Sequence, residues 1–217
     1  RTLEETEFYV QDDWTVNNHW MFSGGVRTNF SEAFGFMYMP KIAAKYSPDD
    51  YWAIRANYSM GYRSPSIKEL FFNWDHLGMF MIKGNEFLKP EKNNYVSAGV
   101  EYSNRHFFFN STLYGNFYRK KIEGVWRIYD MQYNFEYVNL DRQTIAGVDL
   151  LGRWTPTDWL TLNASYSYVY VSKEKGLRIN TTSPHAATAG VKYSYKNKRN
   201  YRLDAYFNAQ IMGEKQY

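Results

Sequence analysis

Strict alternation of apolar and polar residues is the dominant pattern along this chain. In residues 160–170, leucine, alanine or tyrosine occupies every second position, and most of the intervening residues are threonine, asparagine or serine. Successive side chains of a β-strand point to opposite faces, so this period of two predicts a strand with one apolar and one polar face. The same reading predicts about ten strands and no amphipathic helix. The predicted strands cover residues 5–14, 19–29, 36–46, 51–62, 95–102, 106–118, 144–154, 160–170, 187–195 and 201–211. Pro40 would place the third of them at a sheet edge, because proline cannot donate a ladder hydrogen bond.

The connections between these strands alternate in length. Short turns are predicted at 15–18, 47–50, 103–104, 155–158 and 196–200, and longer connections at 30–34, 63–93, 119–142 and 172–184. Tyrosine and tryptophan also mark the strand ends, at Trp14, Trp20, Trp52, Tyr62, Trp154, Tyr170, Tyr193 and Tyr195. Strands of about ten residues, short turns on one side, long loops on the other and aromatic girdles are typical of an outer-membrane β-barrel. The polar face carries too many amide, hydroxyl and charged groups for the core of a soluble sandwich, which remains the alternative fold.

Composition narrows the class of protein further. Aromatic residues make up 20% of the 217 residues, whereas the mean hydropathy is only −0.62. No run of 18 apolar residues occurs, so no transmembrane helix is predicted, but a barrel strand shows lipid only every second side chain. The absence of cysteine excludes disulfides and thiolate sites.

Charge and motifs argue against nucleic-acid binding and catalysis. The net charge is +4, and the densest basic run, at 196–202, lies between two alternating segments, where a solvated turn is expected. No GxSxG, HExxH, GxGxxG or Walker motif occurs, so no enzymatic activity is predicted. The first ten residues contain no apolar signal-peptide segment, which suggests a processed protein or a piece of a longer one.

The connection at 63–93 is the one in which a binding site is expected, because long connections in compact domains are usually functional. It carries Gly61-Tyr62-Arg63-Ser64-Pro65-Ser66 followed by Glu69-Leu70, and then Gly84-Asn85 and Leu88-Lys89-Pro90-Glu91-Lys92. This pair of motifs resembles the signature of TonB-dependent outer-membrane receptors. In that family an arginine-proline motif leaves one barrel strand and an asparagine-leucine-lysine-proline-glutamate motif precedes the next. Later segments, from Asn139-Leu140 to residues 160–166, also resemble that barrel.

The resemblance implies an antiparallel transmembrane barrel of about 22 strands with a plug in its lumen. Residues 1–217 would form part of that single barrel domain, without the plug, and the loops near 63–93, 119–142 and 172–184 would be extracellular. The implied partners are outer-membrane lipid, a TonB-type energising protein that acts through the plug, and a small metal chelate. An alternative is that the ten strands close into a small barrel by themselves.

The implied ligand is haem or a ferric siderophore, with cobalamin as the alternative. Haem receptors of the family have a histidine between the two motifs, and His76 lies in that interval. Imidazole is a haem-iron ligand, and Trp74, Met79, Phe80 and Met81 would give the porphyrin an apolar seat. The other interpretation of His76 is a solvent-exposed or hydrogen-bonded loop residue.

The motifs depart from the haem-receptor pattern at Ser64, which replaces alanine, and at Glu86-Phe87, which replaces proline-asparagine. Arg63 is predicted to be either a cation that faces the ligand or a structural partner of Glu69 or Glu91. Two other function classes remain open at this point: a passive porin and a soluble carbohydrate-binding β-sandwich.

Overall fold

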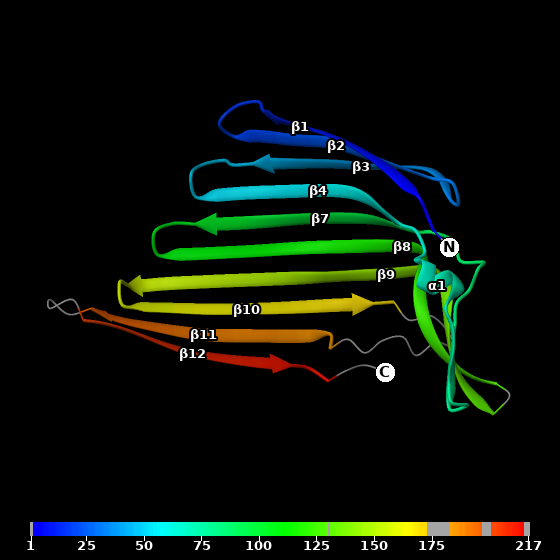
Figure 1. The fold of residues 1–217 in the computed structure, drawn as a ribbon. Helices are drawn as coiled ribbons and strands as arrows, with labels where there is room; N and C mark the ends of the chain where they lie inside the picture. The colour runs from blue at the N-terminus through cyan, green and yellow to red at the C-terminus, as the bar shows by residue number, and fades with distance from the viewer. Residues whose placement is uncertain (1, 130, 173–182, 197–200, 215–217) are drawn as a thin grey trace.

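A computed structural model describes residues 2–129, 131–172, 183–196 and 201–214. These residues form one 12-stranded sheet with a short helix at one end (Figure 1). Ten strands pair with their neighbours in chain order, so each turn or loop joins adjacent antiparallel strands. They are β1 (Glu5–Thr15), β2 (Trp20–Ser31), β3 (Gly35–Tyr46), β4 (Trp52–Arg63), β7 (Glu91–Ser103), β8 (Phe107–Tyr129), β9 (Gln132–Thr157), β10 (Leu160–Val171), β11 (His185–Lys196) and β12 (Arg202–Met212). All ten strands predicted from the alternation are confirmed.

The register places apolar side chains of successive strands in line. Ile42 lies opposite Tyr58, and Tyr58 lies opposite Val96. The row then continues across the next three strands through Gly115, Ala146 and Tyr170. This apolar face is open: 60% of Ile42 and 71% of Phe8 are exposed. A sandwich would cover such a face with a second sheet, and none packs on it within the described residues.

The sheet is open at both edges. β1 and β12 end the strand order, and the described part of the chain contains no pairing between them. The ten strands therefore form part of a barrel wall rather than a closed ten-stranded barrel. Within the described residues no helix has the length and apolar character needed to cross a membrane.

Pro40 lies inside the sheet and not at its edge. β3 is flanked by β2 and β4, and Pro40 pairs with Val26 on the β2 side. On the other side, the pairing of β3 with β4 stops at Lys41. The proline is thus accommodated at the point where β3 separates from β4, which corrects the expectation of an edge strand.

The long connections contain regular structure that the alternation did not predict. Residues 64–90 include the helix α1 (Ile67–Phe71) and a hairpin of β5 (Asn73–His76) and β6 (Phe80–Lys83). Residues 119–142, expected as a connection, are mostly paired strand, because β8 and β9 continue as one long hairpin to Tyr129 and Gln132. Most of the expected loop at 172–184 lies outside the described residues.

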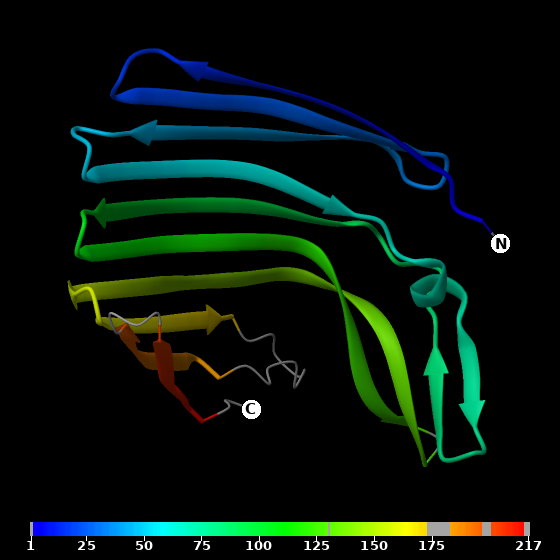
Figure 2. The same ribbon diagram turned by 60° about the vertical axis from the view of Figure 1, so that its left-hand side comes forward.

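The long hairpin bends away from the barrel wall. Figure 2 shows the outer parts of β8 and β9 turning beside the β5–β6 hairpin. Lys120 has φ 54°, and neither it nor Asp141 joins the otherwise continuous β8–β9 ladder. At this end of the sheet Leu70, Leu88 and Ile122 form the buried cluster. The apolar core therefore lies at the rim, where the connections pack on each other.

Candidate functional site

Arg63 is held by two carboxylates at the base of the 64–90 segment. It ends β4 and lies opposite Glu91, the first residue of β7. Its Nη1 donates to both carboxylate oxygens of Glu69 at 3.0 Å, and its Nη2 donates to Glu91 at 3.2 Å. The pairing predicted for Arg63 is therefore present, with both acids as partners.

The protonation of this cluster follows from its contacts. Burial alone would lower the pKa of Arg63, but the hydrogen bonds to Glu91 and Glu69 outweigh it and raise the pKa. Burial would likewise raise the pKa of Glu69, and hydrogen bonds from the Ser66 backbone and Arg63 lower it instead. Arg63 and Glu69 therefore stay charged and paired at neutral pH.

The first motif builds a capped helix turn. The Ser66 hydroxyl accepts from the Glu69 backbone N–H at 3.2 Å, and the Glu69 carboxylate accepts from the Ser66 N–H at 2.7 Å. This reciprocal pair is a capping box, which starts α1 directly after the buried Pro65. Glu69 thus caps the helix and binds Arg63 with the same carboxylate.

Residues of the second motif attach the 64–90 segment to the long β8–β9 hairpin. The Asn139 side chain accepts from the Lys89 N–H at 2.7 Å and donates to the carbonyls of Lys89 and Lys120 at 2.8 and 2.7 Å. Asn85 donates to the Tyr137 carbonyl at 3.0 Å. Gly84 passes so close to the helix that a Cβ there would lie 2.7 Å from the Leu70 carbonyl. The two motifs therefore act as an anchor that positions the loops.

A four-stranded loop sheet extends beyond this anchor. We define it as β5, β6, residues 121–129 of β8 and residues 132–140 of β9. β5 pairs with β6, and β6 pairs in parallel with β9, with Phe80 beside Tyr133 and Ile82 beside Phe135. Strand alternation gives this sheet two chemically different faces. The side chains of its aromatic face are Trp74, His76, Phe80, Ile82, Trp126, Ile128, Tyr133 and Phe135.

The aromatic face is a connected set of rings that remains open to solvent. Phe80 contacts Trp74 and His76, with ring centroids 5.8 and 4.8 Å apart, and Trp126 at 5.7 Å. Trp126 in turn contacts Phe135 at 5.1 Å. Trp74 and Trp126 are still 42% and 58% exposed. A ligand with flat apolar surface would therefore find a preformed contact area there.

His76 lies within this ring set. Its imidazole is 4.9 Å from the Trp74 ring and half-buried. Among the described residues its nitrogens make no hydrogen bond, and no group of three or more histidine or acidic side chains could hold a metal ion. The hairpin turn that follows is fixed by the Asp75 side chain, which accepts from the Gly78 N–H at 2.9 Å.

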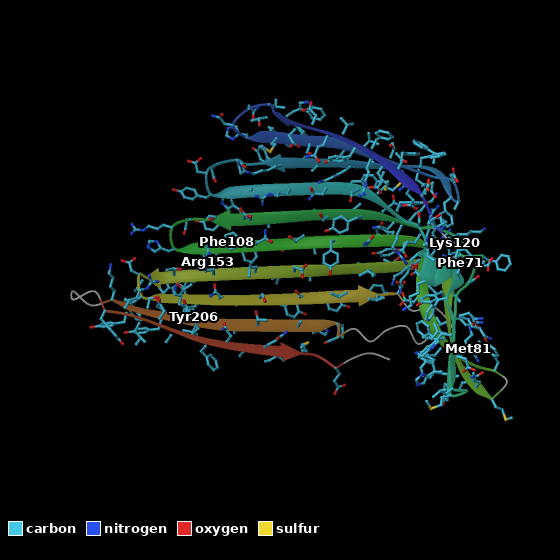
Figure 3. The ribbon with its side chains drawn as sticks, in the orientation of Figure 1. Phe71, Met81, Phe108, Lys120, Arg153 and Tyr206 are labelled. Carbon is cyan, nitrogen blue, oxygen red and sulfur yellow. The ribbon has the colours of Figure 1, made fainter. Side chains whose placement is uncertain are left out.

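The structure places the predicted ligand-binding residues in three different locations. Trp74, His76 and Phe80 share the aromatic face, and Met79, 60% exposed, is beside them in the turn. Met81 pairs with Asp75 on the opposite face. Figure 3 labels Met81 on the loop sheet, beyond α1. Arg63 lies at the anchor rather than on either face.

Sequence reasoning missed five of the eight residues of the aromatic face, namely Ile82, Trp126, Ile128, Tyr133 and Phe135. Trp126 and Ile128 on β8, and Tyr133 and Phe135 on β9, each show the period of two. The alternation therefore contained the signal for a hairpin in residues 121–137.

The reverse face of the loop sheet is polar. Lys83 donates to the Tyr129 hydroxyl at 2.8 Å, and that hydroxyl donates to Glu136 at 2.5 Å. The Lys83 ammonium also lies 4.7 Å from the centre of the Tyr129 ring. The aromatic face alone thus offers an apolar surface.

Comparisons with known proteins agree with this geometry. The family model for TonB dependent receptor-like β-barrels matches residues 1–216. The chain is 25% identical over 178 residues to a probable hemoglobin and hemoglobin-haptoglobin-binding protein of Haemophilus influenzae, covering 73% of this chain and 18% of the relative. It is 26% identical over 180 residues to the vitamin B12 transporter BtuB of Photobacterium profundum, covering 80% and 27%.

The fold is also found in solved structures. The crystal structure of the siderophore receptor PirA from Pseudomonas aeruginosa superimposes with a TM-score of 0.81 at 16% identity, covering 99% of this chain and 40% of that one. The chain spans between 18% and 28% of the length of the curated relatives it matches.

Proposed function

The chain belongs to the TonB-dependent receptor β-barrel family of the bacterial outer membrane, and from this premise we propose that it is part of a receptor that binds a metal-chelate nutrient. The barrel wall is the scaffold, and the loop sheet is the ligand-binding surface. Import would draw on a TonB-type energising protein acting through a plug outside this chain. The long connections would then face the cell exterior.

The observation that carries this proposal is the aromatic face of the loop sheet. It lies at the long-connection end, on a hairpin pair fastened to the barrel by the Arg63 and Asn139 contacts. A rigid sheet holds its side chains in fixed relative positions, so little ordering is needed on binding. An exposed apolar area of this kind usually marks an interaction site.

Haem is the chelate that this face suits best. Its porphyrin is flat and apolar and matches the rings of Trp74, Phe80 and Trp126. His76 stands in the same ring set with no hydrogen-bond partner among the described residues, so an imidazole nitrogen is available for iron. The family resemblance places a histidine at this interval in haem receptors.

A haem titration of the complete receptor in detergent tests the proposal. Wild type should give a saturable shift of the Soret band, and His76→Ala should lose it, while His106→Ala, a histidine at the short-turn end, should keep it. No shift in wild type would refute haem. Quenching of tryptophan fluorescence by a ferric siderophore or by cobalamin would then identify the chelate class, and no quenching by either would refute the nutrient site on this face.

A further inference from the structure

Three basic side chains line up on the apolar face of the sheet at its long-connection end. Lys92 on β7 pairs with Arg119 on β8, which pairs with Arg142 on β9. All three are exposed. Adjacent strands lie about 4.8 Å apart, so the three Cα atoms span roughly 10 Å. We call these three residues the outer cation row.

No direct contact with the described part of the protein neutralises the row. None of its three side chains forms an ion pair or hydrogen bond with the described residues. The adjacent acid, Asp141, is bound by Lys120 and feels the charge of Arg142 only at longer range. Like charges on directly opposed strand positions repel each other, so three of them side by side call for an external counter-charge.

The height of the row on the barrel wall indicates where that counter-charge lies. The row continues through Tyr62 on β4, and Trp52 begins the same strand on the same face. About ten residues separate these two aromatics, which is about 33 Å along a strand and roughly 25 Å along a barrel axis at the usual tilt. That is the height of the lipid-facing apolar band of an outer-membrane barrel.

Toward the short-turn end, the next row on the same face is mixed, with Asn94, Phe117 and Thr144, and the rows beyond it are mostly apolar. Phe117 and Leu113 precede Arg119 on β8 and are 46% and 61% exposed, and Val96 on β7 is 41% exposed. Long basic side chains at such a boundary keep their stems on the apolar surface and their charges among the headgroups. The row thus lies at the outer membrane interface, on the lipid side of the wall.

We propose that the outer cation row binds the phosphate groups of an anionic lipid in the outer leaflet. Arginine and lysine both bind phosphate through charge-assisted hydrogen bonds, and the three stems are close enough to share one headgroup. The proposal rests on the long connections facing outward, as in the proposed function, but not on the identity of the nutrient. Haem binding at the loop sheet and lipid binding at the row can fail independently.

Lipid binding to the complete receptor, measured by native mass spectrometry from detergent, tests this. The probe is lipid A, a glycolipid with two phosphates, and phosphatidylcholine is the zwitterionic comparison. The variant is Lys92→Gln with Arg119→Gln and Arg142→Gln. Each cation near a membrane surface contributes about fivefold in affinity, so the triple variant should bind lipid A roughly 100-fold more weakly.

The matched control removes three exposed cations elsewhere: Lys41→Gln, Arg105→Gln and Arg127→Gln. It should bind lipid A as wild type does. Equal loss in the control, unchanged binding in the row variant, or equal binding of phosphatidylcholine by wild type would overturn the proposal. If millimolar inorganic phosphate weakened lipid A binding as much as the triple substitution does, the row would be a general anion site, and the lipid assignment would be overturned. If the triple variant does not fold, as judged by heat-dependent gel mobility, the single variants carry the test, each with a loss of about fivefold.

Discussion

Arg63 and Glu91 face each other where β4 ends and β7 begins, with 3.2 Å between the Arg63 Nη2 and a carboxylate oxygen of Glu91. Because 28 residues separate them, this ion pair closes the base of the whole 64–90 segment. The same Glu91 oxygen accepts from the Ile122 N–H at 2.9 Å. The Glu91 carboxylate thereby connects the 64–90 segment and the outer part of the β8–β9 hairpin to the barrel wall.

Arg63→Ala should loosen the 64–90 segment without unfolding the barrel. Glu69 and Glu91 would lose their shared cation, but Arg63 is 43% exposed, so solvent screening limits the cost to about 1 kcal/mol. Cleavage within 64–90 by a protease should become about fivefold faster in the complete receptor. Arg105→Ala, an exposed arginine in a short turn, is the control, and equal rates in the two variants would contradict the anchoring role.

The same anchor should weaken on acidification. The pKa of folded Glu69 lies below its ordinary value of 4.5, so its contribution to stability is fully present above that value and is lost as pH falls through the lowered pKa. Amide exchange at Leu70, compared between pH 6 and pH 3 after correction for intrinsic rates, should show this loss in wild type. Glu69→Gln should show a smaller pH effect, and an identical pH effect would exclude Glu69 as its source.

The barrel wall was predictable from sequence, whereas the loop sheet left a signal only in its hairpin at residues 121–137, for physical reasons. Lipid-facing strands alternate over about ten residues, which leaves a long signal. β5 and β6 have four residues each, too few for a period to stand out. At Lys120 the left-handed backbone interrupts the β8–β9 ladder, which separates the short alternation of the hairpin beyond it from that of the barrel strand.

The anchor was partly predictable. Pairing with Glu69 or Glu91 was one of the two roles predicted for Arg63, the other being a cation that faces the ligand. The Arg63 guanidinium binds both acids because α1 places Glu69 over the β4–β7 ladder. This placement depends on tertiary structure. The opposite placement of Met81 and His76 follows from a hairpin register that no local pattern determines.

Gly84→Ala should destabilise the anchor. The new methyl group would lie 2.7 Å from the backbone of Leu70, and a backbone in a capped helix turn cannot move aside as a flexible side chain can. Overpacking of this kind costs about 1–3 kcal/mol. Gly152→Ala is the control, because a Cβ there would meet its first neighbour at 4.0 Å.

Thermal unfolding and amide exchange in residues 64–90 measure the outcome for the two glycine variants. Exchange in this segment should accelerate in the Gly84 variant alone. A Gly84 variant that exchanges like wild type would show that the segment can shift at no cost.

Asn139→Asp and Asn104→Asp make the same chemical change with opposite expected results. Asn139 donates to the Lys89 and Lys120 carbonyls, so a carboxylate would lose both bonds and face two acceptors. Asn104 accepts from the N–H groups of His106 and Phe107, a role that aspartate can fill, and it donates to the Tyr102 hydroxyl, which can donate to a carboxylate instead. The first variant should lose about 2 kcal/mol of local stability.

The second asparagine variant should stay close to wild type. Native-state amide exchange at Lys89 and at Phe107 measures each site directly. Equal losses at the two sites would mean that donor and acceptor roles do not determine the cost.

Ligand affinity should depend on which face of the loop sheet a side chain occupies, and not on its distance from His76 along the chain. Trp126 lies 50 residues beyond His76 yet shares the aromatic face through Phe80. Met81 is five residues away and points to the polar face. Trp126→Ala should therefore weaken binding of haem or of a ferric siderophore about tenfold, equivalent to about 1.4 kcal/mol of lost contact. Met81→Ala should change it less than about twofold. Equilibrium titration of each complete receptor variant measures both affinities. The register holds the two side chains on opposite sides of one sheet, so a larger loss of affinity in Met81→Ala than in Trp126→Ala would place the ligand on the polar face.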